Sequence, residues 1–296
     1  MRQVRDERAI CPYTAESITS MTQESIVFEL QKMYQLAIAA ETRDGSYAGE
    51  FDYLDKLLSL LDINKGYAVD IAASDGFTQS STLGFFKRND WSGLAVEMDS
   101  KKFASLAFIY SNFPNVRLAK NKVTPVNIVD LLVCYDTPKQ FDLLNLDIDS
   151  YDLYVIEAML NGGFRPKVIS MEINEKIPTP IFFTVDYHPS HYWTMDHFFG
   201  CSLQAAVTIV KPFGYILQNL VYNNAIFVRS DVAHSSMHDM EAGLAYLSGY
   251  KNGPDRKKLF PWNSDVDCWM EYSTDQAILS IKEYFLKYTG KYTVRK

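Results

Sequence analysis

The sequence predicts an α/β fold with a seven-stranded, mostly parallel sheet, one antiparallel strand and helices on both faces. Short apolar stretches alternate with helical patterns from residue 66 onward, which is typical of a parallel sheet with helical crossovers. The last two apolar stretches, 215–221 and 225–228, are separated by only three residues, so we expect a hairpin and one antiparallel strand there. With 296 residues, 47% of them hydrophobic, the chain can bury one large core. These observations indicate a Rossmann-like arrangement.

The expected elements follow from the same patterns. The strands are expected at 66–72, 93–96, 116–119, 142–147, 167–172, 215–221 and 225–228. The helices between them are expected at 79–88, 101–111, 128–134, 151–161 and 202–211. Extra helices are expected at 24–40 and 53–61 before the first strand, and near 237–247 and 275–288 after the last. We therefore divide the chain into an N-terminal helical extension or cap (1–62), a Rossmann-like ligand-binding domain (63–231) and a mainly helical C-terminal tail packed on that domain (232–296).

Composition excludes several classes of partner. The formal net charge is −7 and no long Lys/Arg run occurs, which disfavours a nucleic-acid partner because phosphate binding leaves a basic footprint. No stretch approaches the roughly 18 apolar residues of a membrane span. The four scattered cysteines, Cys11, Cys134, Cys201 and Cys268, indicate reduced thiols rather than a disulfide framework. We expect a soluble cytoplasmic protein without a membrane partner, and a homo-oligomer is left open.

The most informative stretch is residues 66–76, a buried strand that leads into a turn of small residues. An acidic residue at the strand end, Asp70, and small side chains in the turn suit a ribose-bearing ligand, because backbone N–H groups can then approach it closely. The turn lacks the three glycines of the dinucleotide fingerprint and the Gly-Lys-Ser/Thr of a P-loop. An Asp-x-Gly-x-x-Asp-Gly loop of the kind that cradles S-adenosylmethionine remains, with Ala72 at the first glycine position. The cofactor-binding residues expected from this loop are Asp70, Ala72, Ser74, Asp75 and Gly76; the plainer alternative is an ordinary strand–turn–helix.

Two further residues extend this ligand site. Glu97 closes the second strand, 27 positions after Asp70, where an acidic residue usually accepts hydrogen bonds from ribose hydroxyls. A solvated carboxylate at a strand end is the alternative. Asn121 follows the third strand, and its side chain is expected at the same edge of the sheet.

Carboxylates gather after the fourth and fifth strands. Asp147 and Asp149 share one face of an extended strand end, and Glu172 closes the neighbouring strand. Such oxygen-rich groups can hold Mg²⁺, so Asp147 and Glu172 are candidate metal ligands. Asp147 is equally a candidate general base. The alternative is hydrogen bonding within loops and at helix ends, with Ser150 as the N-cap of the next helix.

A long loop rich in proline and aromatic residues follows the fifth strand and carries His188 and His191. Histidine titrates near neutral pH, so both are candidate general bases. Exposed loop histidines without a role are the alternative.

These segments together resemble the class I S-adenosylmethionine-dependent methyltransferases, and more narrowly the FkbM-like methyltransferases. The similar pieces are VDIAASDG (69–76), GLAVE (93–97), LNLDIDSYD (144–152), PKVISMEIN (166–174), FGCSL (199–203) and NNAIFV (223–228). The resemblance covers roughly residues 60 to 231. It implies that the first two segments hold the methionine part and the adenosine ribose, and that Asp147 faces the acceptor or a metal.

The sequence therefore predicts an S-adenosylmethionine-dependent methyltransferase that methylates a hydroxyl of a sugar, a glycan or another small molecule. Alignment of the acceptor with the methyl group is the main task, with Asp147, His188 or His191 as base or a cation between Asp147 and Glu172. Two alternatives stay open. A non-catalytic binding protein with this fold is favoured by Ala72, and a nicotinamide-dependent oxidoreductase is disfavoured by the missing glycines.

Overall fold

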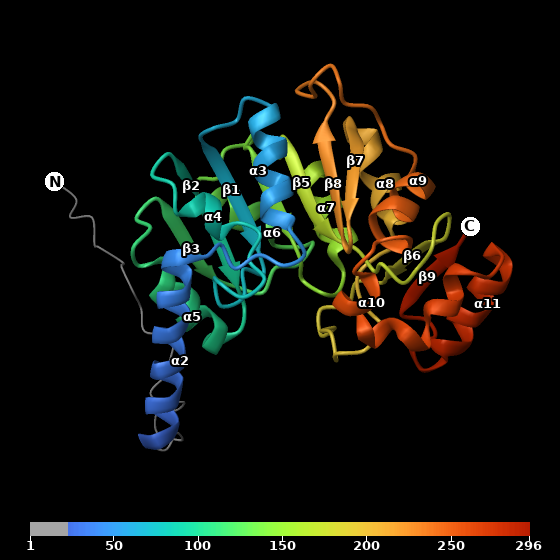
Figure 1. Ribbon diagram of the computed structural model, residues 1–296, viewed down its shortest axis with the longest axis horizontal. Coiled ribbons are helices and arrows are strands. Elements are labelled where there is room, and N and C mark those ends of the chain that lie inside the picture. The colour runs from blue at the N-terminus through green and yellow to red at the C-terminus, as the bar shows by residue number, and fades with distance from the viewer. Residues whose placement is uncertain (1–22) are drawn as a thin grey trace.

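The structure, a computed structural model, describes residues 23–296, and a seven-stranded sheet forms its centre (Figure 1). Cys11 and the first part of the predicted cap lie outside the described residues. The strands of the sheet are β1 (Gly66–Ile71), β2 (Trp91–Glu97), β3 (Val116–Lys120), β4 (Leu143–Leu146), β5 (Val168–Glu172), β7 (Tyr215–Val221) and β8 (Asn224–Arg229). Their order is β3-β2-β1-β4-β5-β8-β7, and β8 alone runs opposite to the other six strands. The predicted mostly parallel sheet with one antiparallel strand is confirmed.

The strand order reverses between β1 and β4. The chain first proceeds outward from β1 to β2 and β3, then returns to place β4 on the other side of β1. Crossovers therefore leave in opposite directions from two adjacent strands, which opens a crevice beyond their carboxyl ends. The residues that follow β1 and β4 line this crevice.

Helices cover both faces of the sheet, as the sequence predicts. Alternate residues of β1 belong to different cores: Ala68 packs with one cluster, and Val69 and Ile71 with the other. The first face is covered by α3 (Glu50–Leu60), α4 (Leu83–Phe86) and α5 (Ser100–Tyr110). The second is covered by α6 (Ile128–Cys134), α7 (Asp152–Asn161), α8 (Leu203–Val210) and α9 (Ala242–Tyr246). Burial on both faces explains why the central strands are mostly apolar rather than alternating between apolar and polar residues.

The helix expected at 79–88 is largely a loop, and α4 occupies only its last part. Gln79 has φ +58°, which a right-handed helix does not allow. The Asp75 carboxylate accepts the N–H groups of Phe77 and Thr78, and the Ser80 hydroxyl accepts the N–H of Leu83. These side chains bond to the backbone locally and hold residues 75–82 in turns, in competition with a helix.

The N-terminal extension consists of α2 (Gln23–Thr42) and α3. In Figure 1, α2 projects away from the sheet and packs along α5, while α3 lies on the sheet itself. The chain between them approaches the C-terminal part, where the Tyr47 hydroxyl donates to the carbonyl oxygen of Leu259 at 2.8 Å. None of the described helices is both long and apolar enough to cross a membrane.

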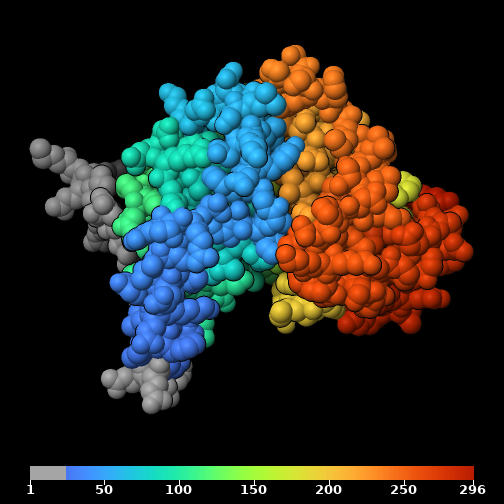
Figure 2. All heavy atoms as spheres, viewed as in Figure 1, coloured from blue at the N-terminus to red at the C-terminus, as the bar shows by residue number. Residues whose placement is uncertain are grey.

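The C-terminal part adds a small sheet and a core of its own. Strand β9 (Tyr292–Arg295) pairs antiparallel with β6 (Phe182–Val185), a strand that the sequence patterns did not predict. Helix α11 (Thr274–Tyr284) packs on this pair around the buried side chains of Phe183, Phe198 and Phe285. The remaining short helices are η1 (Lys211–Phe213), η2 (Leu247–Lys251), α10 (Arg256–Leu259), η3 (Pro261–Asp265), η4 (Asp267–Met270) and η5 (Leu286–Tyr288). Figure 2 shows the residues from α9 to β9, in orange and red, as a continuous C-terminal lobe (residues 242–296) to the right of the blue N-terminal residues.

Candidate functional site

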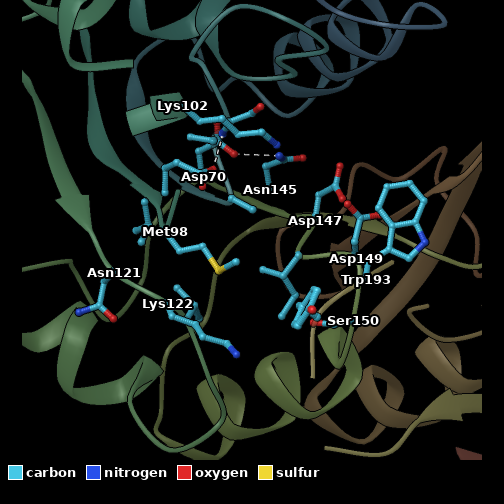
Figure 3. A pocket seen from close by; sticks show the side chains of 18 of the residues that line it. Asp70, Met98, Lys102, Asn121, Lys122, Asn145, Asp147, Asp149, Ser150 and Trp193 are labelled. Carbon is cyan, nitrogen blue, oxygen red and sulfur yellow. Dashed lines mark hydrogen bonds between the residues drawn. The ribbon is translucent and has the colours of Figure 1, made fainter. Parts of the chain in front are cut away.

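A cavity of about 320 Å³ lies beyond the carboxyl ends of β1, β2 and β4 (Figure 3). Five segments line it: the loop after β1, the ends of β2 and β3, the loop after β4 and residues 191–193. Its volume falls at the lower end of the range of small-molecule sites, roughly 300–1,000 Å³. The crevice at the switch point of the sheet is therefore large enough to bind a small molecule.

The loop after β1 keeps an unusual backbone although it contains a single glycine. Ala72, Ser74 and Gly76 have φ values of +68°, +53° and +81°. A left-handed conformation at a non-glycine residue costs roughly 1–2 kcal/mol, so Ala72 adopts at a cost the conformation that a glycine would adopt freely. Backbone strain of this kind gathers at functional sites.

The predicted residues of this loop divide into two groups. Ala72 and Ser74 line the cavity, whereas Asp75 and Gly76 are not part of its wall. A Cβ atom on Gly76 would lie 2.7 Å from Cδ1 of Leu106, so a glycine is needed for close packing against α5. Asp75 braces the loop through its bonds to Phe77 and Thr78. Both residues shape the loop from behind.

Asp70 is buried at the cavity wall with both carboxylate oxygens hydrogen-bonded. Its Oδ2 accepts from the Thr82 hydroxyl at 2.5 Å and its Oδ1 from Asn145 Nδ2 at 2.9 Å. Burial raises the pKa of Asp70, and these two bonds oppose the increase. Asn145 is paired with Asp70 in the β1–β4 register and was missed by the sequence analysis. Asp70 thus ties the loop after β1 to β4.

Glu97 lies in the cavity wall at the end of β2, as expected, and joins two segments of backbone. Its Oε2 accepts the N–H of Ser74 at 2.9 Å and its Oε1 that of Asp99 at 2.6 Å. Burial raises the pKa of Glu97, opposed by these bonds and by the nearby Lys102 ammonium. Each carboxylate oxygen can accept a second hydrogen bond, so Glu97 can hold the loop and still receive ligand hydroxyls.

The cavity wall also contains an apolar side chain, an amide and ammonium groups. Asn121 lines it as expected, together with Met98, Lys102 and Lys122, which the sequence analysis did not single out (Figure 3). Met98 is 52% exposed, and a flexible thioether on an open cavity wall suits contact with a flat ring. The sequence feature that could have identified Met98 as a cavity residue is its position directly after Glu97.

The far end of the cavity is acidic. Asp147 and Asp149 line it. One carboxylate oxygen each of Asp147, Asp149 and Glu172 lies within 4.8 Å of the other two. Burial and the Asp149 charge raise the pKa of Asp147 well above its usual value, and burial and the Asp147 charge do the same for Glu172. Repulsion of this kind is relieved either by a shared proton or by a cation.

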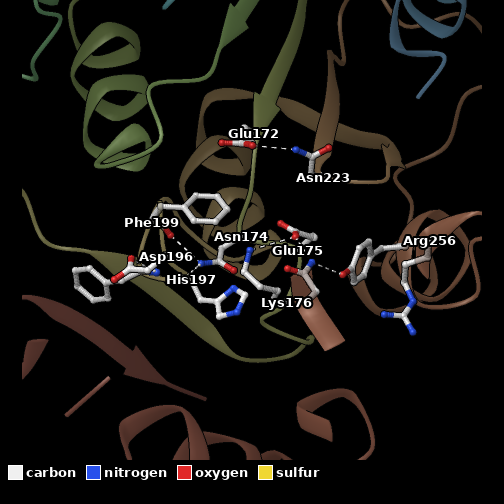
Figure 4. Close-up of polar contacts among 12 residues, drawn as sticks. Glu172, Asn174, Glu175, Lys176, Asp196, His197, Phe199, Asn223 and Arg256 are labelled. Atoms are coloured by element: carbon white, nitrogen blue, oxygen red, sulfur yellow. Dashed lines mark hydrogen bonds and ion pairs between the residues drawn. The ribbon is translucent and has the colours of Figure 1, made fainter. Parts of the chain in front are cut away.

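Glu172 lies next to Asp147 but is not part of the cavity wall. Its Oε1 accepts from Asn223 Nδ2 at 2.9 Å (Figure 4). Asp149 has φ +56°, which turns the chain sharply after β4. The expected N-cap at Ser150 is wrong: Tyr151 is the N-cap residue, and the Asp152 carboxylate accepts the N–H groups of Ile148 and Ser150. Burial raises the pKa of Asp152 to about 6.

The two candidate histidines differ. His191 lines the cavity, whereas His188 is exposed and its Nδ1 contacts the Ser190 hydroxyl at 2.7 Å. Burial, followed by the charges of Lys122 and Lys291, lowers the pKa of His191, so its ring is neutral at pH 7. Its Nε2 has no hydrogen-bond partner in the part of the chain that the structure describes. Of the two, only His191 is brought to the site.

Comparison with known proteins gives structural matches only. No protein-family model and no curated protein matches the chain. It is similar to the N-terminal domain of EvdMO1, solved with SAH and D-fucose, at 11% identity and a TM-score of 0.42, over 71% of this chain and 97% of that one. It is also similar to S-adenosylmethionine-dependent methyltransferases from Clostridium acetobutylicum (10% identity, TM-score 0.40, 69% and 98% covered) and Aquifex aeolicus (10%, 0.37, 64% and 95%).

Matches at this identity and TM-score assign no substrate or residue role to this chain. The sheet order with the antiparallel β8 is that of a Rossmann-like fold, whereas membership of the class I S-adenosylmethionine-dependent methyltransferases, and of the FkbM-like subfamily, stays a prediction.

Proposed function

We propose that this protein is an S-adenosylmethionine-dependent O-methyltransferase whose acceptor is a hydroxyl of a sugar, a glycan or a similar small molecule. One observation carries the proposal: a single cavity has two chemically different ends. The end at β1, β2 and β3 offers a strained loop, Glu97 and Asn121, and the other end offers Asp147, Asp149 and Trp193. A donor and an acceptor can therefore bind side by side.

The first end suits the adenosine and methionine parts of the cofactor. Glu97 retains acceptor capacity for ribose hydroxyls, and Ala72, Ala73 and Ser74 line the cavity at the same end. Met98 offers an apolar surface for the adenine ring, and Asn121 offers an amide at the same wall. The residues present thus fit this group without a glycine at position 72.

S-adenosylmethionine supplies a methyl group on a positively charged sulfur, so transfer to a hydroxyl leaves S-adenosylhomocysteine, a methyl ether and one proton. The task of the protein is to align the acceptor oxygen and to receive that proton. Asp147 is the preferred base because it lines the cavity and its raised pKa brings it closer to neutral pH. His191 is the second candidate, since it is neutral and lacks a partner at Nε2 among the described residues.

A divalent cation is the remaining part of the proposal. Asp147, Asp149 and Glu172 could supply the one or two carboxylates that Mg²⁺ needs, with waters and acceptor hydroxyls completing its shell. Such a cation would lower the pKa of the acceptor hydroxyl. Asp147 would then orient the acceptor rather than receive its proton.

The test is a screen of sugars, glycans and polyols with methyl-labelled S-adenosylmethionine, comparing the wild type with Asp147→Asn. Asp136→Asn is the control, because Asp136 is an exposed carboxylate that is not part of the cavity wall. We expect Asp147→Asn to lower turnover by about 10²-fold or more while S-adenosylhomocysteine affinity stays nearly unchanged.

Full turnover in Asp147→Asn, or loss of its cofactor binding, would show that the assigned role is wrong. A protein that binds S-adenosylhomocysteine but methylates nothing in the screen would instead support the non-catalytic alternative. Binding of NAD in its place would support the oxidoreductase.

A further inference from the structure

Trp193 lies at the acidic end of the cavity, and its one polar side-chain atom, the indole nitrogen, already donates a hydrogen bond within the protein. It lines the cavity together with Asp147 and Asp149, and Figure 3 shows its indole on the same side as those carboxylates. The indole N–H donates to the backbone oxygen of Asp196 at 2.6 Å, and the ring meets Phe199 edge-on at a centroid distance of 5.8 Å. The ring is therefore fixed in place and offers the cavity an apolar aromatic surface.

An aromatic surface beside carboxylates suits one kind of ligand particularly well. The C–H groups of a saturated ring carry partial positive charge and pack against the negative face of an aromatic ring. The hydroxyl groups at the rim of the same ligand can donate to carboxylates such as Asp147 and Asp149. A cyclic polyol holds its C–H groups on one rigid face and satisfies both requirements, whereas an open-chain alcohol has no such fixed face.

The segment that carries Trp193 has no regular secondary structure, so its position depends on side-chain anchors. On the cavity side, Lys122 Nζ donates to the backbone oxygens of Pro189 and His191 at 2.7 and 3.2 Å. Next to Trp193, Asn174 Nδ2 donates to the backbone oxygens of His197 and Phe199, both at 2.9 Å (Figure 4). These bonds hold the segment at both ends.

The C-terminal lobe supplies the third anchor, at Asp196. The Asp196 carboxylate accepts hydrogen bonds from the Tyr288 hydroxyl, from Lys287 Nζ at 3.2 Å and from the N–H of Phe198 at 3.0 Å. Phe198 also stacks on Tyr288, with ring centroids 3.8 Å apart and planes inclined by 10°. Because Asp196 holds the indole N–H through its own backbone oxygen, this anchor acts directly on Trp193.

We infer that Trp193 is the specificity-determining surface for a cyclic polyol acceptor, and that Asp196 and Tyr288 of the C-terminal anchor are positioning residues for it. The inference rests on the proposed function and adds the residue that selects the acceptor. It also gives the C-terminal lobe a role: Tyr288, about 90 positions after Asp196 in the chain, helps to position Trp193 at the acceptor end of the cavity.

The test compares Trp193→Ala, Trp193→Phe and Tyr288→Phe, with Trp262→Phe as control because Trp262 is exposed and lies outside the cavity wall. The acceptor is the best cyclic substrate found in the labelled-methyl screen, and S-adenosylhomocysteine affinity is measured by calorimetry in parallel. Trp193→Ala should raise KM for the acceptor by about tenfold without changing S-adenosylhomocysteine affinity, and Trp193→Phe should restore most of the loss. Tyr288→Phe should raise KM by about threefold and leave kcat nearly unchanged.

An unchanged KM in Trp193→Ala would overturn the inference, as would equal losses on cyclic and open-chain acceptors. If Trp193→Ala does not fold, Trp193→Phe and Tyr288→Phe carry the comparison, and a fall in kcat alone would contradict a positioning role. A wild type that methylates no acceptor overturns the proposed function as well, whereas normal turnover that is indifferent to Trp193 overturns this inference alone.

Discussion

Glu50 is a buried acid whose charge can be removed without loss of its contacts. It is 6% exposed; its Oε1 accepts from Asn224 Nδ2 at 2.6 Å and its Oε2 from the Ser81 hydroxyl at 2.7 Å. Burial raises its pKa from 4.5 to about 7, against the effect of these two bonds. In Glu50→Gln, the amide oxygen can accept from Asn224 and the amide nitrogen can donate to the hydroxyl oxygen of Ser81. The variant therefore isolates the effect of the charge.

The size and sign of the effect follow from linkage. A pKa that is higher in the folded state than in the unfolded state means that the folded protein binds the proton more tightly. The resulting stabilisation is fully present below about pH 4.5 and is lost as the pH rises through about 7. A shift of this size corresponds to ~3 kcal/mol. Glu50→Gln does not lose this stabilisation, so its advantage over the wild type should grow between pH 5 and pH 8.

Urea unfolding at pH 5, 6, 7 and 8, followed by circular dichroism, measures this difference. We expect Glu50→Gln to be more stable than the wild type at pH 8 by up to ~3 kcal/mol, with the difference shrinking toward pH 5. Glu41→Gln is the matched control, since Glu41 is an exposed acid of the N-terminal extension. A difference that stays constant with pH would refute the reasoning, because Glu50 would then not titrate in this range. Destabilisation at every pH would show that the two hydrogen bonds require the carboxylate.

Three further predictions concern the site. Glu97→Ala should weaken S-adenosylhomocysteine binding by about 1.5–3 kcal/mol, and an unchanged Kd in calorimetry with the fold intact would remove Glu97 from the site. Activity on the true acceptor should fall with EDTA and return with Mg²⁺; full turnover in chelator would leave His191 or Asp147 as the base. Gly76→Ala should lower the free energy of unfolding by about 1–3 kcal/mol in urea titrations, since it adds both strain and a clash with Leu106. Gly163→Ala has the same sign of φ and no atom within 4 Å, so an equal loss there would rule out the clash.

Much of the fold could be predicted because it depends on local patterns. Buried strands of a parallel sheet are short and apolar, and the two-residue link between β7 and β8 leaves only a hairpin. The position of the site followed as well, since polar residues after Ile71, Val96 and Leu146 must meet at one edge of the sheet. Neither inference needed any contact distant in sequence.

Other features depend on such distant contacts. Strand β6 exists because β9, more than 100 positions later, pairs with it, and a four-residue apolar run gives no sign of that partner. His188 and His191 look equivalent in sequence, and only the structure shows that His191 lines the cavity while His188 is exposed; Lys122, 69 positions before His191, donates to the backbone of this segment at Pro189 and His191. Trp193 carries no motif, and its position depends on Asp196 and the C-terminal lobe.

The structure shows contacts of Asp70 and Glu97 that the sequence did not predict, whereas their role in ligand binding stays a prediction. Each was expected to bind ligand, and each also holds backbone or side-chain partners of its own protein. A sequence pattern reports that a carboxylate is required at a strand end, but not how its four acceptor sites are shared between protein and ligand.

The most direct test of the account is calorimetric titration of the wild type with S-adenosylhomocysteine and, separately, with NAD. We expect S-adenosylhomocysteine to bind at one site per chain, and to stabilise the protein by about 2.7 kcal/mol at 100 times its Kd. NAD should neither bind nor stabilise. Absence of S-adenosylhomocysteine binding, or tighter binding of NAD, would contradict the assignment of this cavity to a methyl donor.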